Sequence, residues 1–175
     1  MNINEIASLI RDIADFPKKG VIFKDIVPIL SDSAAFAATI DLLKKAMEET
    51  GTHFDAICGL ESRGFIFGAP LAVACGLPFV PVRKAGKLPP PVISQSYKLE
   101  YGEATLEISK GIVAPGANVC IVDDILATGG TMMAAAKLVE SCQANPALLL
   151  TFAELPALKG RDFLKGYAVK TLLEV

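Results

Sequence analysis

The stretch IVDDILATGGT, residues 121–131, leads from apolar residues through two aspartates into a cluster of small residues. The apolar run ANVCIVDD, residues 117–124, has the composition of a buried strand, and GGTMMAAAKLVESC, residues 129–142, has that of a helix. A strand that leads through a short loop into a helix is the repeating unit of parallel α/β sheets. This stretch therefore predicts an α/β fold.

The same alternation continues on both sides. The further expected elements are strands over residues 55–60, 78–83, 146–155 and 167–175, helices over residues 31–51 and 63–76, and an antiparallel hairpin over residues 94–109. Strands that alternate with helices form a mostly parallel twisted sheet flanked by helices, and ligands bind beyond the carboxyl ends of its strands. Because the chain contains no linker or low-complexity tract, we expect residues 1–175 to form one domain.

The first 32 residues are expected to form a small segment beside this sheet. An amphipathic helix is predicted over residues 4–16 by apolar residues at helical spacing, namely Ile6, Leu9, Ile10 and Ile13. Residues 17–30 contain two prolines and a glycine, so they are expected to form a loop with short extended pieces.

Composition and charge exclude several classes of function. The net charge of −2 gives no general attraction to nucleic acid or to an anionic membrane. The four cysteines are widely spaced among apolar residues, which indicates buried thiols of a cytoplasmic protein and not disulfides or metal ligands. The uncharged run over residues 64–82 is interrupted by prolines and a glycine, so we expect a buried helix and strand there and no membrane span.

Two carboxylates precede a candidate phosphate site. Residues 127–131, ATGGT, open a helix, and the unpaired N–H groups and positive dipole of a helix start favour a phosphate. The stretch has neither the G-K-[ST] of a nucleoside-triphosphate loop nor the G-x-G-x-x-G of a dinucleotide site. A ribose 5-phosphate suits both halves, because Asp123 and Asp124 can accept hydrogen bonds from ribose hydroxyls while the loop binds the phosphate. A helix N-cap, the structural alternative, needs only one aspartate.

IVDDILATGGT resembles the phosphoribosyl-pyrophosphate signature of the type I phosphoribosyltransferase family. Further segments, which together cover nearly the full length, resemble its adenine-specific members: FPKKGVIFKDI (16–26), GLESRGFIFGAPLA (59–72), VRKAGKLP (82–89), YKLEYGEATLEI (97–108) and LKGRDFL (158–164). The resemblance implies the type I phosphoribosyltransferase fold, with a small N-terminal hood and a flexible flap over residues 93–110. It also implies a pentosyl transfer of purine salvage, in which adenine and 5-phosphoribosyl 1-pyrophosphate give AMP and pyrophosphate.

The resemblance places the donor's phosphates on three loops. The loop ESRG, residues 61–64, is implied to bind pyrophosphate through Arg63, with a cis peptide near Glu61–Ser62. The basic loop after the second strand is implied to neutralise the same group through Arg83, Lys84 and Lys87. The loop for the 5-phosphate comprises Ala127, Thr128, Gly129, Gly130 and Thr131. Part of the basic loop is implied to reach a neighbouring subunit, and the resemblance therefore also implies a homodimer.

The resemblance further assigns the base and the proton transfer. Adenine is expected to be read by the Ile22 carbonyl and the Lys24 amide, with Phe23 and Ile125 on either side of its ring. On the flap, Glu100 is the candidate proton acceptor and Tyr101 is expected near the phosphoribosyl group. Mg²⁺ is the expected cofactor, held by pyrophosphate oxygens and water without a direct protein ligand.

Two alternatives stay open at this stage. One is transfer to another base, such as xanthine, hypoxanthine or orotate, although the apolar GVIF, residues 20–23, offers no side-chain donor for a 6-oxo group. The other is a non-catalytic regulator that senses the phosphoribosyl donor. A regulator of that kind is expected to carry a nucleic-acid-binding module or a basic face, and the sequence shows neither.

Overall fold

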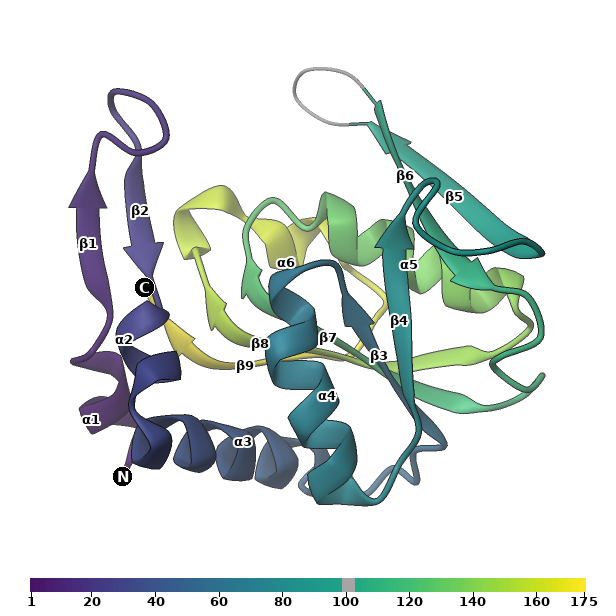
Figure 1. The fold of residues 1–175 in the computed structure, drawn as a ribbon, viewed down its shortest axis with the longest axis horizontal. Coiled ribbons are helices and arrows are strands. Elements are labelled where there is room, and N and C mark those ends of the chain that lie inside the picture. Colours follow the sequence, from purple (N-terminus) through teal and green to yellow (C-terminus); the bar gives the residue numbers. More distant parts are fainter. Residues whose placement is uncertain (99–102) are drawn as a thin grey trace.

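The computed structural model describes residues 1–98 and 103–175, and within them a seven-stranded sheet has the order β5-β6-β4-β3-β7-β8-β9 (Figure 1). Its strands are β3 (Ala56–Leu60), β4 (Phe79–Lys84), β5 (Val92–Lys98), β6 (Glu103–Ser109), β7 (Asn118–Leu126), β8 (Asn145–Glu154) and β9 (Val169–Glu174). Neighbouring strands from β4 to β9 are parallel, whereas β6 pairs antiparallel with both β4 and β5. The predicted mostly parallel sheet is confirmed.

Helices cover both faces of this sheet, as predicted (Figure 1). On one face α3 (Ser33–Glu48) and α4 (Arg63–Cys75) enclose a core with the inward side chains of β7 and β8. On the other face α5 (Gly130–Ser141) packs against β5, β6 and β7 around a second core. β7 contributes alternate residues to both cores, so its carboxyl end is held firmly from two sides.

Two glycines let α4 approach the sheet closely. A Cβ on Gly64 would lie 2.6 Å from the Val122 carbonyl oxygen, and a Cβ on Gly68 would lie 3.0 Å from the Phe79 ring. The G-x-x-x-G spacing therefore serves packing against the sheet, and it places the start of α4 beside Asp123. Among the residues that the structure describes, no helix combines the length and the apolar character that crossing a membrane requires.

The prediction of a helix over residues 4–16 is wrong for its second half. Helix α1 (Ile3–Ala7), which Asn2 caps, ends early, and β1 (Arg11–Ala14) pairs antiparallel with β2 (Ile22–Asp25) in a hairpin outside the main sheet. Ile6 is buried, but Ile13, which was expected on the same helical face, is 39% exposed. The helical spacing therefore joined residues from two different elements, and strand pairing within the hairpin determined the structure after residue 10.

Three short elements were not predicted. Helix α2 (Val27–Ser31) begins next to Pro28 and packs on α3, whose N-cap Asp32 accepts hydrogen bonds from the Ala34 and Ala35 amides. The 3₁₀ turn η1 (Pro156–Leu158) and the one-turn helix α6 (Gly160–Phe163) follow β8. All of these elements are too short to leave a periodic apolar signal in the sequence.

Candidate active site

A cavity of about 480 Å³ opens at the carboxyl ends of β3, β4 and β7. In Figure 1 the β1–β2 hairpin stands on one side of this edge of the sheet and the β5–β6 hairpin on the other. The cavity is lined by Glu61, Ser62, Arg63, Lys84, Tyr97, Ala104, Leu106, Asp123, Asp124 and Thr131. The structure thus brings the acidic pair, Arg63, Lys84 and Thr131 together, as the sequence predicts for one ligand site.

The acidic pair lies within β7, not at its end as predicted. The strand was expected to end at residue 124, but it pairs with β8 as far as Leu126. Asp124 is 3% exposed, whereas Asp123 is partly exposed and lines the cavity. The Asp123 Oδ1 atom accepts a hydrogen bond of 2.9 Å from the Asp124 amide, which orients this carboxylate.

The electrostatics of the pair favour neutralisation by a partner. Burial first and the charge of Asp124 second raise the pKa of Asp123 well above its usual value. Burial also raises the pKa of Asp124, and the nearby Arg63 guanidinium counteracts this shift only in part. Asp124 Oδ2 is buried, and within the described residues the Arg63 guanidinium pairs with it at 2.8 Å. Donors from a ligand could therefore join or replace Arg63 at a carboxylate that is costly to leave without a partner.

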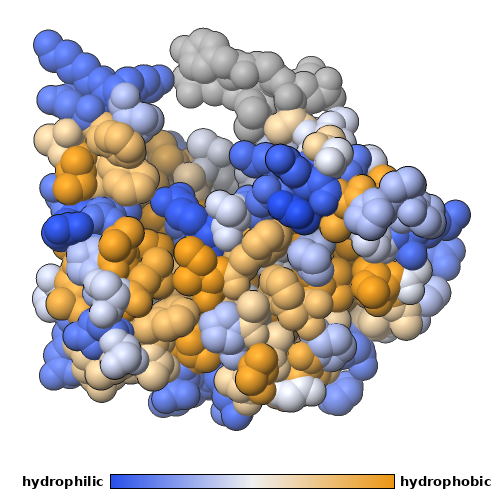
Figure 2. Space-filling view, viewed as in Figure 1, coloured by the Kyte–Doolittle hydropathy of each residue, from blue (hydrophilic) through white to orange (hydrophobic). Residues whose placement is uncertain are grey.

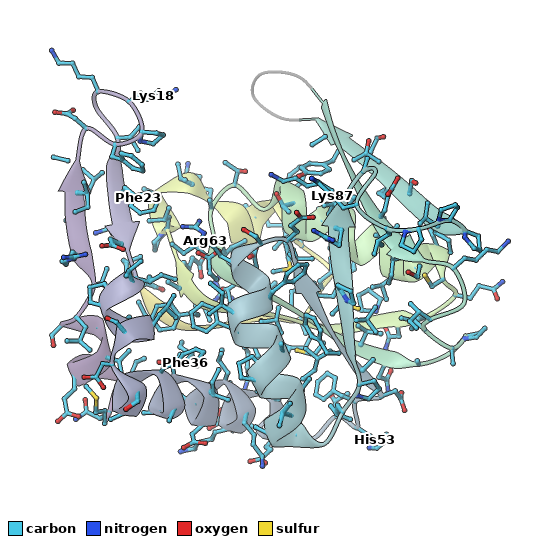
Figure 3. The ribbon with its side chains drawn as sticks, viewed as in Figure 1. Lys18, Phe23, Phe36, His53, Arg63 and Lys87 are labelled. Carbon is cyan, nitrogen blue, oxygen red and sulfur yellow. The ribbon has the colours of Figure 1, made fainter. Side chains whose placement is uncertain are left out.

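Arg63 links the acidic pair to the N-terminal hairpin. Its Nε lies 2.8 Å from Asp124 Oδ2 in an ion pair, and its guanidinium lies 5.7 Å from the centre of the Phe23 ring. In Figure 3 the Arg63 side chain lies between β2 and α4, on the side of the site where Phe23 projects. The resemblance implies that Arg63 binds pyrophosphate; this structure shows its contacts with Asp124 and Phe23, and the pyrophosphate role stays a prediction.

Glu61 connects the ESRG loop to the basic loop. The peptide between Glu61 and Ser62 is cis, as expected from the resemblance. The Glu61 carboxylate accepts hydrogen bonds from Arg83 Nε at 3.2 Å, Arg83 Nη2 at 3.3 Å and the Lys84 amide at 2.9 Å. These bonds, the one from Arg83 first, lower the pKa of Glu61. Arg83 also donates to the Lys87 carbonyl, so it braces both loops while Lys84 faces the cavity.

The predicted phosphate loop encloses a second, smaller hollow of about 70 Å³ next to the main cavity. Its lining consists of Asp123 and the whole stretch from Ile125 to Met132, including Ala127, Thr128 and Gly130. Gly129 has φ +85° and precedes the first turn of α5, so the loop turns through a conformation that favours glycine. The sequence-predicted loop residues therefore lie together around one hollow at a helix start.

Tyr97 is a cavity residue that the sequence reasoning missed. It lies on β5, and its hydroxyl is 3.4 Å from Thr131 Oγ1 at the start of α5. The alternation of the hairpin, which points every second side chain to the same face, could have indicated that Tyr97 faces the cavity. Glu100 and Tyr101 lie outside the described residues, so their predicted roles stay predictions.

The residues that were predicted to recognise the base lie on the exposed hairpin and on β7. The Phe23 ring packs edge-on against Phe16 at 5.2 Å, Ile22 is 60% exposed, and Lys24 Nζ pairs with Asp12 at 2.9 Å. Ile125 packs against the core under α3 and α4. Phe23 is thus joined to Asp124 through Arg63, and Figure 3 shows the Phe23 and Arg63 side chains near each other.

The described part of the chain contains no group of three or more His, Cys, Asp or Glu side chains that could hold a metal ion. Carboxylates and basic side chains share the main cavity. This donor set is compatible with a polyanion that brings its own cation, because Mg²⁺ is often held mainly by substrate phosphates and water.

Comparison with known proteins places the chain in a family. The phosphoribosyl transferase domain matches residues 28–163. The adenine phosphoribosyltransferase of Thermoanaerobacter pseudethanolicus is 52% identical over 174 residues, which are 99% of each chain. The solved structure of the Saccharomyces cerevisiae enzyme, in complex with an imino-altritol bisphosphate and adenine, has a TM-score of 0.94 and 44% identity and covers 98% of both chains.

A more distant structure shows the same fold. The adenine phosphoribosyl transferase of Trypanosoma brucei, in complex with AMP, pyrophosphate and ribose 5-phosphate, is 25% identical with a TM-score of 0.89. It covers 98% of this chain and 78% of its own. Full-length similarity to such relatives, and the matched domain over more than half of its residues, show that this chain belongs to the adenine phosphoribosyltransferase family.

Proposed function

We propose that the protein transfers the phosphoribosyl group of 5-phosphoribosyl 1-pyrophosphate to adenine, giving AMP and pyrophosphate. One observation carries the proposal: an acidic pair, in which the buried Asp124 forms an ion pair with Arg63, lies directly before a glycine-rich loop at a helix start. Relatives of nearly the same length at about 50% identity are named for this reaction.

The ribose 5-phosphate half of the donor fits the carboxyl end of β7. The N–H groups at the start of α5 and the hydroxyls of Thr128 and Thr131 bind the 5-phosphate in the small hollow. Asp123 and Asp124 then accept hydrogen bonds from the ribose hydroxyls, and these bonds are charge-assisted. On binding, a ribose hydroxyl replaces Arg63 as the partner of the buried Asp124 oxygen.

The pyrophosphate half fits the basic side of the cavity. Lys84 faces it directly, Arg83 is held by Glu61 at its edge, and Lys87 belongs to the same loop, which Figure 3 shows at the end of β4. Arg63 can turn from Asp124 toward the departing group once the ribose hydroxyls replace it at the carboxylate. Mg²⁺ on the pyrophosphate would neutralise part of its charge, and none of the described residues is assigned to hold the ion.

Adenine fits the hairpin side. In a strand, residues two apart direct their backbone groups to the same edge, so the Ile22 carbonyl and the Lys24 amide can bind one base together. The carbonyl accepts from the 6-amino group, the amide donates to ring N1, and Phe23 and Ile125 contact the ring faces. Glu100 takes the proton that adenine loses, and Tyr101 contacts the phosphoribosyl group, by the resemblance.

We further propose that residues 1–175 act as one domain, that the protein forms a homodimer and that it works in the cytoplasm. The exposed side of α4 supports the dimer, because Ile66 and Val73 are 37% and 84% exposed there. Figure 2 shows apolar side chains gathered over the middle of this face. Four cysteines without disulfides support a reducing compartment.

The direct test is AMP formation from adenine and 5-phosphoribosyl 1-pyrophosphate, with and without Mg²⁺. We expect turnover with adenine that requires Mg²⁺, and little or none with hypoxanthine, xanthine or orotate. Turnover of an oxo base but not of adenine would refute the proposed substrate. No turnover of any base, together with binding of the donor, would favour a sensor instead.

A further inference from the structure

The segment after β8 packs against the back of the phosphate loop, on the side away from the cavity. This segment contains η1 and α6 and corresponds to the sequence LKGRDFL, which the proposed chemistry does not use. We propose that Gly160 is a positioning residue that fixes the geometry of the loop formed by Ala127, Thr128 and Gly129. The proposal rests on the proposed function only for the identity of the bound phosphate.

The contact between the two segments depends on a glycine on each side. A Cβ on Gly160 would collide with the Ala127 carbonyl oxygen and would lie 3.0 Å from the Leu126 side chain. A Cβ on Gly129 would lie 2.8 Å from the Gly160 carbonyl oxygen. The two backbones therefore touch over a distance that no other residue type allows at either position.

The α6 side of this contact is anchored to the sheet. Arg161 Nε lies 2.6 Å from the Glu154 carboxylate, which is buried at the end of β8, and Arg161 Nη1 donates to the Val169 carbonyl at 3.1 Å. Leu164, the residue after α6, is 1% exposed in the core under α5. Gly160 is consequently held by β8, β9 and the core, so the loop has to adjust when the contact becomes crowded.

One side of the loop over residues 127–129 packs against protein, and its other side faces the small hollow. The Leu155 amide donates to the Leu126 carbonyl at 2.9 Å, which ties the start of the loop to the same support, while the other side of the loop lines the small hollow. A side chain at position 160 would push the Ala127 carbonyl toward the hollow. Ligands that place a phosphate there should lose affinity, and ligands without a phosphate should not.

The test compares Gly160→Ala with Gly116→Ala. Gly116, unlike Gly160, has a positive φ, +79°; it is exposed with open space around its Cβ position and lies before β7, so its substitution strains the backbone away from the loop. By calorimetry, we expect Gly160→Ala to weaken AMP binding by about tenfold to 100-fold while adenosine binding stays the same, because misplacement by about 1 Å can cost that much. Gly116→Ala should leave both affinities unchanged.

Equal losses for AMP and adenosine, or no loss for AMP, would overturn the proposal. A wild-type protein that binds no AMP would instead refute the proposed function. The positioning role is then decided by amide NMR shifts of residues 127–131, which must move in Gly160→Ala and not in Gly116→Ala. If Gly160→Ala does not fold, Arg161→Gln serves as a second variant, because it keeps Gly160 but removes the ion pair that anchors it. Arg161→Gln should weaken AMP binding, by less than Gly160→Ala, and leave adenosine binding the same. Equal effects of Arg161→Gln on AMP and adenosine would contradict the proposal.

Discussion

The acidic pair with the proposed phosphate loop, residues 121–131, and the β1–β2 hairpin both contact Arg63 but are built differently. Asp123 and Asp124 belong to a strand between two cores, and the loop after them is supported from behind by Gly160. The hairpin lies outside the main sheet, and every residue of β1 is exposed. Its strands are joined by the ion pairs Arg11–Asp25 and Lys24–Asp12 at the surface.

This difference suggests a division of labour. In the proposed function, side chains whose positions burial fixes bind the donor, and backbone groups on a lightly supported hairpin bind the base. Substitutions on the β7 side should therefore affect donor affinity strongly, while most side-chain changes on the hairpin should affect little besides adenine. Substitutions on the two regions test this expected difference in sensitivity.

The largest effect is expected from the double variant Asp123→Asn with Asp124→Asn. Each charge-assisted hydrogen bond contributes roughly 1.5–3 kcal/mol, so donor affinity should fall by about 100-fold or more. The fold should not suffer, because burial already penalises the charged forms of both side chains. Calorimetry of donor binding and a thermal melt measure the two effects.

Asp162→Asn is the matched control, since it removes a carboxylate from an exposed ion pair with Lys165 on the far side of the loop. It should leave donor affinity within about twofold, because such surface pairs contribute little. Unchanged donor affinity in the double variant would contradict the assignment of the ribose hydroxyls to this pair.

The next effect in size concerns the aromatic residue of the hairpin. Phe23→Ala should raise the KM for adenine about tenfold, because stacking of a base on an aromatic ring contributes roughly 1–3 kcal/mol. The KM for the donor should stay the same, although Arg63 loses its ring neighbour. Steady-state kinetics with each substrate varied in turn decide this, with Ile112→Ala, another exposed apolar residue, as the control. Equal changes in both KM values would show that the two sides are not independent.

A third prediction uses pH. The folded pKa of Asp123 is raised, so its charged form is disfavoured in the native state: the free energy of unfolding should decrease as pH rises from the ordinary carboxylate pKa through the raised value. Donor affinity should change in the opposite direction, because the carboxylate must be ionised to accept both hydroxyl hydrogens. Denaturation and donor-binding curves measured over pH 4–8 test these two trends. Titration of one carboxyl group should change the donor affinity by at most about tenfold per pH unit. Identical pH profiles for wild type and Asp123→Asn would contradict it.

The same difference between buried and exposed elements explains which parts of the fold could be predicted from the sequence. β7, β8 and the helices α3, α4 and α5 are long, and the short β3 is buried throughout, so burial imposed the expected structure on them. The loop over residues 127–131 lies where its small residues indicated. The hairpin has almost no buried apolar face, and its structure is determined by the antiparallel pairing of β1 with β2, from Arg11 opposite Asp25 to Ala14 opposite Ile22. A local helical pattern was therefore misleading there.

Contacts between distant segments could not be predicted from the sequence for another reason. The Arg63–Asp124 ion pair, the Tyr97–Thr131 contact and the approach of Gly160 to Gly129 each join elements far apart in the chain. Spacing within one element carries no information about them. Glu61 shows the limit well: the sequence indicated its loop, but not that its carboxylate would bind Arg83 and the Lys84 amide.

The smallest effect is expected from Lys24→Met, and it sharpens the comparison most. The Lys24 side chain pairs with Asp12, whose carboxylate is 57% exposed, so its loss should lower the free energy of unfolding by at most about 1 kcal/mol. Adenine binds the Lys24 amide in our proposal, and this amide is retained, so the KM for adenine should change less than about twofold for so exposed a pair. Arg11→Met, which removes the other ion pair of the hairpin, should behave in the same way. If Lys24→Met alone raised the KM for adenine tenfold, the side chain would be reading the base, and the hairpin would act through a side chain just as β7 does.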